Sequence, residues 1–264
     1  MSRLVYIGGY GHSGSTLLEY LMTASPEVVA CGEVVNAWRE QARERRCSCG
    51  RLAEVCPIWG PLSNGSNGSE RLRHEDLDLA LLEQISKDQA ILVDSSKTAW
   101  RVAAAPFRLR RRIGSDFFLV HIVRDPIAVC WSLIARNKRM GTESNSALVS
   151  LSTAFGWLYA NLACELFRLM YPTQYHRVRY EDLARSTREA LAALMHRLLP
   201  GREWRFEAIG TSDNRHQLYG NRLRLQQLSV DDVEEDTAWE ANMPSQYRRL
   251  AIPITWILRR RYGY

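Results

Sequence analysis

A segment rich in glycine and hydroxyl residues near the start of the chain has the composition of an anion-binding loop. It reads Gly9-Tyr10-Gly11-His12-Ser13-Gly14-Ser15-Thr16. Glycines let successive backbone N–H groups converge on an anion, and a helix that starts there adds unpaired N–H donors. The spacing nearly matches the P-loop of nucleotide kinases, but Ser15 replaces its lysine. That lysine contacts the β- and γ-phosphates, so the loop favours a single 5′-phosphate group over ATP. A glycine turn that only caps a helix is the alternative.

A second candidate anion site consists of Arg124 and Ser132, eight positions apart. Arg124 follows an apolar run, and the Asp125-Pro126 pair after it is typical of a helix start. A guanidinium can bind a phosphate through two hydrogen bonds, and Ser132 lies about two helical turns further along. Taken alone, an Arg-Asp-Pro turn would equally fit a structural clamp.

These residues need a scaffold, and the apolar pattern predicts one. We expect strands at 4–7, 90–93, 117–123 and 174–179, and helices at 15–23, 98–112, 126–137 and 146–170. Alternating strands and helices predict an α/β fold with a central parallel sheet and helices on both faces. Ligands bind at the carboxyl ends of such strands, and each predicted strand ends in a polar cluster.

The composition is that of an ordinary globular protein. The chain has 264 residues, of which 46% are hydrophobic and 24% charged. These values exclude a disordered tail, a collagen-like repeat and a membrane bundle, and the length fits one domain over 1–264. An irregular segment at 45–69 reads as a surface excursion with a mobile tip.

The charge balance favours an anionic partner. The formal net charge is +6, and all but three of the 35 basic residues are arginines. Because the arginines are dispersed and lack an aromatic RNA-binding pattern, we expect no nucleic acid partner.

The expected location is the cytoplasm. A strand beginning at Leu4 leaves no room for a signal peptide, and no run of about 18 apolar residues predicts a membrane span. The apolar stretch 251–258 is short and interrupted by Pro253. The six cysteines are then expected to be reduced thiols or metal ligands.

On these motifs the sequence resembles bacterial sulfotransferases that use 3′-phosphoadenosine-5′-phosphosulfate (PAPS). Their 5′-phosphosulfate loop commonly reads Lys/Arg-Ser-Gly-Ser/Thr-Thr, which matches positions 12–16 here except for His12. The family also has an Arg–Ser pair that binds the 3′-phosphate, matched by Arg124 and Ser132. The resemblance implies a P-loop-like three-layer fold, PAPS as co-substrate, adenosine 3′,5′-bisphosphate (PAP) as product, and no metal.

Two later segments extend the resemblance. The run Tyr180-Glu181-Asp182-Leu183 is similar to a family signature whose tyrosine lies near the adenine. The segment from His216 to Arg224 resembles one that closes over the nucleotide, with Arg224, and with it Arg222, at the 3′-phosphate. The donor-binding residues implied are Gly11, His12, Ser13, Gly14, Ser15, Thr16, Arg124, Ser132, Tyr180, Asn221 and Arg224.

The catalytic candidates are Glu33, His12 and Lys97. The segment before and including Cys31-Gly32-Glu33 resembles tyrosylprotein sulfotransferases, in which this glutamate is the proposed general base. His12 is the rival base, although its place in the loop favours donation to the leaving group. Lys97 follows Asp94-Ser95-Ser96 and could stabilise charge on the bridging oxygen, unless Ser95 occupies that place. An exposed glutamate and a solvated lysine at helix starts are the alternatives.

Three cysteines recur in bacterial sulfotransferases of this kind, here Cys47, Cys49 and Cys56. Three thiols fall short of a zinc set, and the nearest fourth is Cys31. We therefore expect a packed loop beside the acceptor rather than a metal site, with metal binding left open.

Three other residues have expected structural roles. His121 reads as a hydrogen-bonded core histidine. Trp157 and Asn161 share one helix face, near the acceptor in the family, and core packing is favoured for Trp157.

The expected activity is transfer of a sulfuryl group to a hydroxyl of a small-molecule or carbohydrate-like acceptor, by in-line displacement with a general base. The acceptor and the oligomeric state stay open. A P-loop-type kinase acting on a small molecule and a non-catalytic anion-binding module are the alternatives.

Overall fold

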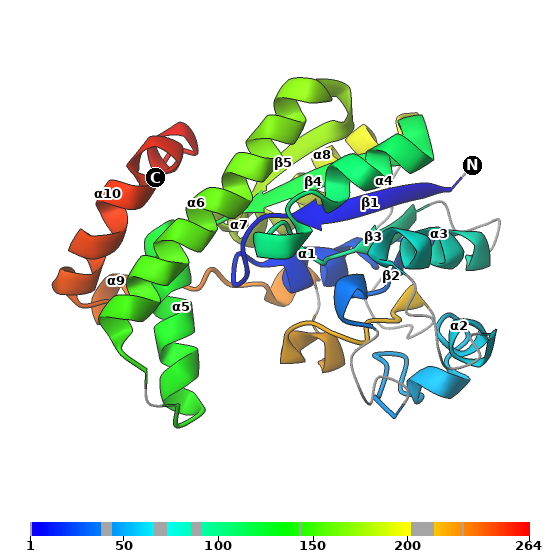
Figure 1. Cartoon of the computed structure of the whole chain (residues 1–264), viewed down its shortest axis with the longest axis horizontal. Coiled ribbons are helices and arrows are strands. Elements are labelled where there is room, and N and C mark those ends of the chain that lie inside the picture. The colour runs from blue at the N-terminus through cyan, green and yellow to red at the C-terminus, as the bar shows by residue number, and fades with distance from the viewer. Residues whose placement is uncertain are drawn as a thin grey trace.

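The computed structural model describes residues 2–37, 44–65, 73–85, 91–142, 144–201, 214–226, 228 and 230–264. The described chain forms a parallel sheet in the order β2-β3-β1-β4-β5 (Figure 1). Its strands are β1 Arg3–Gly8, β2 Val28–Ala30, β3 Ile91–Asp94, β4 Phe117–Val123 and β5 Tyr175–Arg179. The predicted α/β fold with a central parallel sheet is confirmed.

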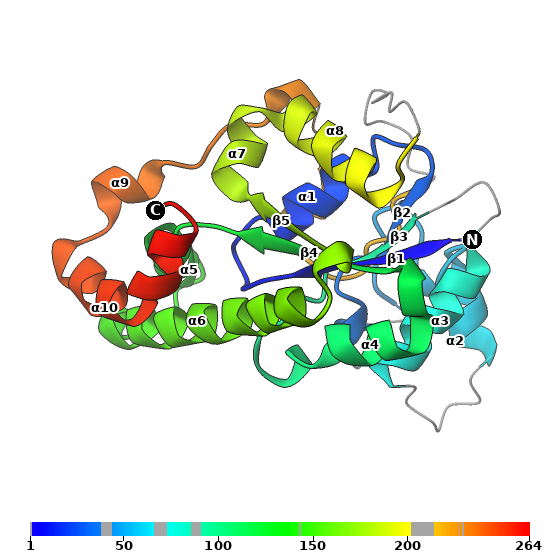
Figure 2. The ribbon, with the colours of Figure 1, turned by 90° about the horizontal axis from the view of Figure 1, so that it is seen from above.

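Helices cover both faces of the sheet (Figure 2). One face carries α1 Ser15–Met22, α7 Tyr180–Arg185 and α8 Thr187–Leu198; the other carries α3 His74–Gln84, α4 Ala105–Ile113 and α6 Ser146–Met170. Side chains alternate along a strand, so Val5 and Ile7 pack in the first layer and Leu4 and Tyr6 in the second. Each layer is therefore a separate hydrophobic core.

Three helices extend the fold beyond the carboxyl end of β4: α5 Pro126–Arg139, α9 Ala238–Asn242 and α10 Ser245–Arg261. They share small cores with α6, which include Ile134, Ala154 and Ala251. Pro253 interrupts the apolar run of the sequence but lies inside α10. The short helix α2 Gly60–Gly65 follows the cysteine segment.

One helix of the described chain, α6, has the length and composition of a membrane span, which the sequence did not predict. An 18-residue window of this helix has a mean hydropathy of 1.3, and 44% of that window is buried inside the protein. Its inner face includes the buried Trp157 and Phe167. Core helices of soluble proteins share these properties, so α6 alone is weak evidence of a span.

The prediction of a helix over 98–112 is wrong at its start. Residues 97 and 98 instead form hydrogen bonds with the end of β1 and the residue after it. The N–H of Lys97 donates to the carbonyl of Ile7, and the N–H of Thr98 donates to the carbonyl of Gly9, each at 3.1 Å. A 3₁₀ turn follows at Trp100–Val102, and α4 begins only at Ala105.

The sequence analysis did not predict the strand β2, because three residues are too few for an apolar period to be recognised.

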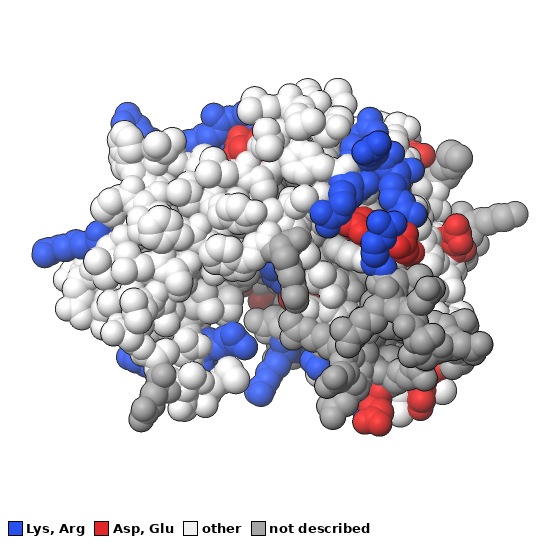
Figure 3. Space-filling model, in the orientation of Figure 1, with Lys and Arg blue, Asp and Glu red and all other residues white. Residues whose placement is uncertain are grey.

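Basic side chains gather over α4, but acidic ones lie among them (Figure 3). Arg108 contacts Glu75, and Arg112 contacts Asp76, both acids belonging to α3. This pairing lowers the attraction of the surface for a polyanion.

Candidate active site

The candidate residues meet at one edge of the sheet, because all five described strands are parallel and end there. The loop 9–14 follows β1, and Glu33 and Lys97 come three residues after β2 and β3. Arg124 follows β4, and Tyr180 follows β5.

The loop after β1 is held in an unusual backbone conformation. Gly9 and Gly14 have φ values of 119° and 95°, and His12, at 66°, also lies in the left-handed region. At Gly9 an added Cβ would lie 2.3 Å from the carbonyl oxygen of Ile122. Only glycine fits there, since both the backbone angle and the available space exclude a side chain.

The interior of the loop suits an anion. Ser13 is buried, and its Oγ has no hydrogen-bond partner among the described residues. A buried hydroxyl without a partner costs about 1–3 kcal/mol, which an anionic oxygen at the start of α1 would recover. Ser15 and Thr16, also buried, begin that helix. The loop therefore fits a phosphate or sulfate group.

Thr98 fixes the loop from the end of β3, a role that the sequence analysis missed. Its Oγ1 accepts the N–H of Gly9 at 3.0 Å and donates to the carbonyl of Ala160 at 2.9 Å. A threonine after a Ser-Ser-Lys run carries no sequence signal for this contact.

The two predicted anion sites are neighbours. Arg124 donates to the backbone carbonyl of His12 at 3.3 Å, and Nδ1 of His12 lies 2.9 Å from Oγ of Ser132. The ring of Tyr180 lies 4.2 Å from the guanidinium carbon of Arg124 and packs against Gly14. Groups separated by more than a hundred residues thus form one surface.

His12 is neutral in this setting. Burial, and after it the positive charges of Arg136, Lys97, Arg124 and Arg139, lower its pKa from 6.5 to about 4. Cations from α5 and from the segments after β3 and β4 therefore act on the same imidazole, and such a concentration of positive charge suits an anion.

Arg124 also binds an acidic residue that the sequence did not indicate. One of its terminal nitrogens lies 2.9 Å from the carboxylate of Asp236, whose backbone N–H donates to the hydroxyl of Tyr180 at 3.1 Å. The Asp236 side chain is 48% exposed. It is therefore a carboxylate that an incoming phosphate could replace. The indole of Trp157 donates to the Arg124 carbonyl at 3.1 Å from the core side.

Glu33 and Lys97 form an ion pair. The second carboxylate oxygen of Glu33 accepts a hydrogen bond from the side-chain amide of Asn36 at 2.6 Å. The backbone N–H of Glu33 donates to the carbonyl of Tyr219 at 3.2 Å. The Lys97 backbone has φ 70°, and its carbonyl accepts from the hydroxyl of Tyr6. Both side chains are partly exposed, at 23% and 15%, so they can reach a bound molecule.

Two buried carboxylates hold the segments that carry this pair. Burial raises the pKa of Glu19 to about 7; it accepts from the N–H of Gly32 at 2.6 Å and from Ser95 Oγ at 2.8 Å. Asp94 accepts from the N–H of Val34 at 3.2 Å and lies 2.8 Å from Nε2 of His74. Sequence reasoning missed Glu19, although a carboxylate in an otherwise apolar helix is a recognisable signal.

The segment after residue 214 only partly follows expectation. The N–H of Asn221 donates to Thr16 Oγ1 at 3.3 Å, so this segment does contact the loop. The Arg224 guanidinium donates to the carbonyls of Gln217 and Arg46, at 2.9 and 3.2 Å. Its role at a 3′-phosphate stays a prediction, as do the donor-binding and catalytic roles of the other residues.

His121 and Trp157, which were expected in the core, are buried, and so is Asn161. The ring of His121 is buried, with Nδ1 2.8 Å from the hydroxyl of Tyr175 and Nε2 2.6 Å from the amide oxygen of Asn161. The prediction of a hydrogen-bonded core histidine is confirmed. Asn161 also donates to the carbonyl of Trp157 at 2.6 Å, and this pair is in the core rather than at a free surface.

The prediction of a surface excursion over 45–69 is wrong for the first part of this segment. Cys47, Cys56 and Trp59 are buried in the same core as side chains of α3 and α4. Three sulfurs meet His216 there, a residue that sequence reasoning had placed only in the nucleotide-closing segment. The predicted mobile tip lies mostly outside the described residues.

The loop geometry predicts a contrast between two glycines. Gly9→Ala should lower the free energy of unfolding by about 2–4 kcal/mol, because of the positive φ and the clash with the Ile122 carbonyl. Gly11→Ala is the matched control: an added Cβ meets nothing within 4 Å, so the change should stay within about 0.5 kcal/mol. Urea denaturation measures both, and equal losses would contradict the described loop.

The lowered pKa of His12 predicts that the stability of the protein depends on pH. Its pKa is lower in the folded than in the unfolded chain, so its neutral form favours folding above pH 6.5, and this contribution is lost between pH 6.5 and about 4. NMR of the imidazole should give a midpoint near 4, rising when inorganic phosphate occupies the loop. His121, whose pKa burial lowers to about 4, is the control and should not respond. A His12 midpoint near 6.5 in the free protein would contradict the site.

Comparison with known proteins agrees with this geometry. The sequence profile described as the sulfotransferase family matches residues 5–205. A search of curated proteins finds no match. The fold is similar to the sulfotransferase domain from the Synechococcus PCC 7002 olefin synthase, with TM-score 0.68, 17% identity, and 100% and 95% of the two chains covered.

Two other solved structures share the fold at lower similarity. The sulfotransferase domain from the curacin biosynthetic pathway has TM-score 0.54 and 19% identity, with 96% of this chain and 97% of that one covered. A sulfotransferase from Mycobacterium avium has TM-score 0.52 and 10% identity, with 99% and 77% covered. Since the profile spans most of the sequence and the fold agrees, this chain belongs to the sulfotransferase family.

Proposed function

We propose that this sulfotransferase takes PAPS as its donor and acts on a hydroxyl of a small-molecule or carbohydrate-like acceptor. The observation that carries the proposal is the contact of Arg124 and Ser132 with His12 of the loop. A nucleotide with phosphates at both its 5′ and 3′ positions needs two neighbouring anion sites, whereas ATP needs only one continuous site.

The donor would be held by residues that already face this surface. The start of α1 and the hydroxyls of Ser13, Ser15 and Thr16 suit the 5′-phosphosulfate. Arg124 suits the 3′-phosphate, with Asp236 as the carboxylate to be displaced. When bound, PAPS supplies the activated sulfuryl group and a stable leaving group.

The ion pair next to the loop suits the transfer itself. Glu33 would take the proton of the acceptor hydroxyl as its oxygen attacks sulfur in line, while the bond from sulfur to the nucleotide oxygen breaks. Lys97 and His12 would donate hydrogen bonds to that oxygen. The ion pair of Lys97 with Glu33 and the effect of the Lys97 charge on the pKa of His12 support this assignment. A neutral imidazole can still donate one hydrogen bond.

Nucleotide binding tests the proposed donor. PAP should raise the thermal midpoint without magnesium, and adenosine 5′-monophosphate should bind at least about tenfold more weakly because it lacks the 3′-phosphate. Arg124→Ala should remove this difference. Arg188→Ala is the control, because Arg188 pairs with Asp231 on the exposed surface. Stabilisation by ATP with magnesium, and not by PAP, would instead indicate a kinase.

Replacement of Glu33 tests the proposed base. Glu33→Gln should slow donor consumption by at least about 100-fold, measured with a panel of phenols, alcohols and sugars, because the amide cannot accept the proton. PAP binding should be unchanged. Glu189→Gln, on the exposed face of α8, is the matched control. If the Glu33→Gln enzyme stays active, Glu33 is not the base, and His12 becomes the candidate.

A further inference from the structure

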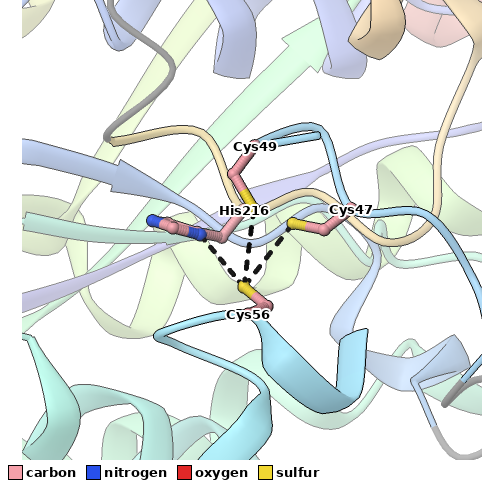
Figure 4. A group of neighbouring side chains, drawn as sticks. All are labelled: Cys47, Cys49, Cys56 and His216. Atoms are coloured by element: carbon pink, nitrogen blue, oxygen red, sulfur yellow. Dashed lines mark hydrogen bonds between the residues drawn. The ribbon is translucent and has the colours of Figure 1, made fainter. Parts of the chain in front are cut away.

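Four side chains with metal-binding groups converge outside the anion site: Cys47, Cys49, Cys56 and His216 (Figure 4). Their ligand atoms all lie within 4.8 Å of one another. Three of the residues are buried, and Cys49 is partly exposed. His216 and Cys56 are 160 positions apart in the chain, so the fold alone brings them together.

The distances are those of ligands around one ion. The sulfur of Cys56 lies 3.7 Å from that of Cys47 and 3.8 Å from that of Cys49. Tetrahedral zinc with Zn–S bonds of about 2.3 Å separates its sulfurs by about 3.8 Å. A disulfide would need about 2.05 Å, and all six cysteines are free. Nδ1 of His216 lies 3.2 Å from the Cys56 sulfur.

We propose that Cys47, Cys49, Cys56 and His216 bind one zinc ion in a tetrahedral Cys₃His site. Thiolates and imidazole together favour zinc among the common divalent ions. Four protein ligands leave no open position, so the site is structural rather than catalytic. An iron–sulfur cluster is a poorer fit, because its ligands surround several irons, whereas these four atoms lie within the span of one ion.

The backbone around the first two cysteines has the form of a metal-binding turn. The N–H of Gly50 donates to the carbonyl of Cys47 at 3.0 Å, and the φ of 87° at Gly50 lets the chain reverse. The N–H groups of Cys49 and Arg51 donate to the sulfurs of Cys47 and Cys49. Such N–H donors orient metal-bound thiolates and offset their charge.

The backbone of the fourth ligand, His216, is held by two hydrogen bonds. The N–H of His216 donates to the carbonyl of Ala30, the last residue of β2, at 2.7 Å. The His216 carbonyl accepts from the indole of Trp59 at 2.5 Å. The backbone of His216 is thus fixed at both its N–H and its carbonyl, which reduces the entropy lost when its side chain binds an ion.

The ion would couple the cysteine segment to the active site. Ser48 and Gln217 exchange two hydrogen bonds, at 2.8 and 3.1 Å, and the Gln217 amide donates to Glu19 at 2.8 Å. Two residues further along, the Tyr219 carbonyl accepts the N–H of Glu33. Zinc would therefore stabilise the segment against which Glu33 is placed.

Metal analysis of the purified full-length chain tests the site without any assay of sulfotransfer. Mass spectrometry of the metals should find about one zinc per chain. After removal of zinc with a chelator, Co²⁺ should bind with the same stoichiometry and give the intense visible bands of tetrahedral thiolate-bound cobalt. A chain that keeps its fold but contains no zinc, and gives no such bands with Co²⁺, would overturn the proposal.

Variants separate the ligands from other buried residues. Cys56→Ser should reduce bound zinc at least about tenfold and lower the thermal midpoint by about 5 °C or more. His216→Cys, which keeps a zinc ligand at that position, should retain the metal. Cys164→Ser is the matched control, since Cys164 is buried but lies 3.2 Å from Thr98 rather than in the cluster. Full zinc in Cys56→Ser, or equal loss in Cys164→Ser, would refute the assignment. The cobalt bands of the unaltered chain decide the matter if the variants fail to fold.

Discussion

The carboxylate of Glu19 joins four parts of this molecule at one buried point. It projects from the helix that follows the anion loop and accepts hydrogen bonds from Gly32, Ser95 and Gln217. These partners lie after β2, after β3 and beside the cysteine cluster. A buried carboxylate is costly unless its oxygens are fully hydrogen-bonded, so each partner is constrained to stay in place. Glu33, Lys97 and the loop depend on that constraint for their relative positions.

Positive charge around the loop is the second organising feature. Burial, and after it the positive charges of Arg136, Lys97, Arg124 and Arg139, lower the pKa of His12, so its imidazole is neutral. The sulfotransferase loop commonly carries a cation at the position of His12. Here His12 stands at that position, and arginines of α5 contribute positive charge from outside the loop. Asp236 neutralises part of this charge through its contact with Arg124.

One segment of the chain contributes to both the proposed zinc site and the proposed donor site. The segment 214–226 carries His216 toward the sulfurs and Asn221 toward Thr16. Arg224 belongs to the same segment and donates to the carbonyl of Arg46, next to Cys47. Metal binding and nucleotide binding would thus stabilise opposite ends of one irregular stretch, which has little secondary structure of its own.

Local sequence determined much of this protein. The strand 117–123 and the helix 146–170 follow from apolar period, and the loop follows from residue spacing, because the interactions behind these features lie within a few turns of chain. The pairing of Arg124 with Ser132 came from the resemblance to sulfotransferases. Tertiary structure alone decided the rest. His216 joins cysteines at least 160 positions away, Asp236 contacts Arg124, and Glu19 accepts hydrogen bonds from three separate segments. No local period encodes such contacts, since they depend on which strand ends the folded sheet brings to one edge.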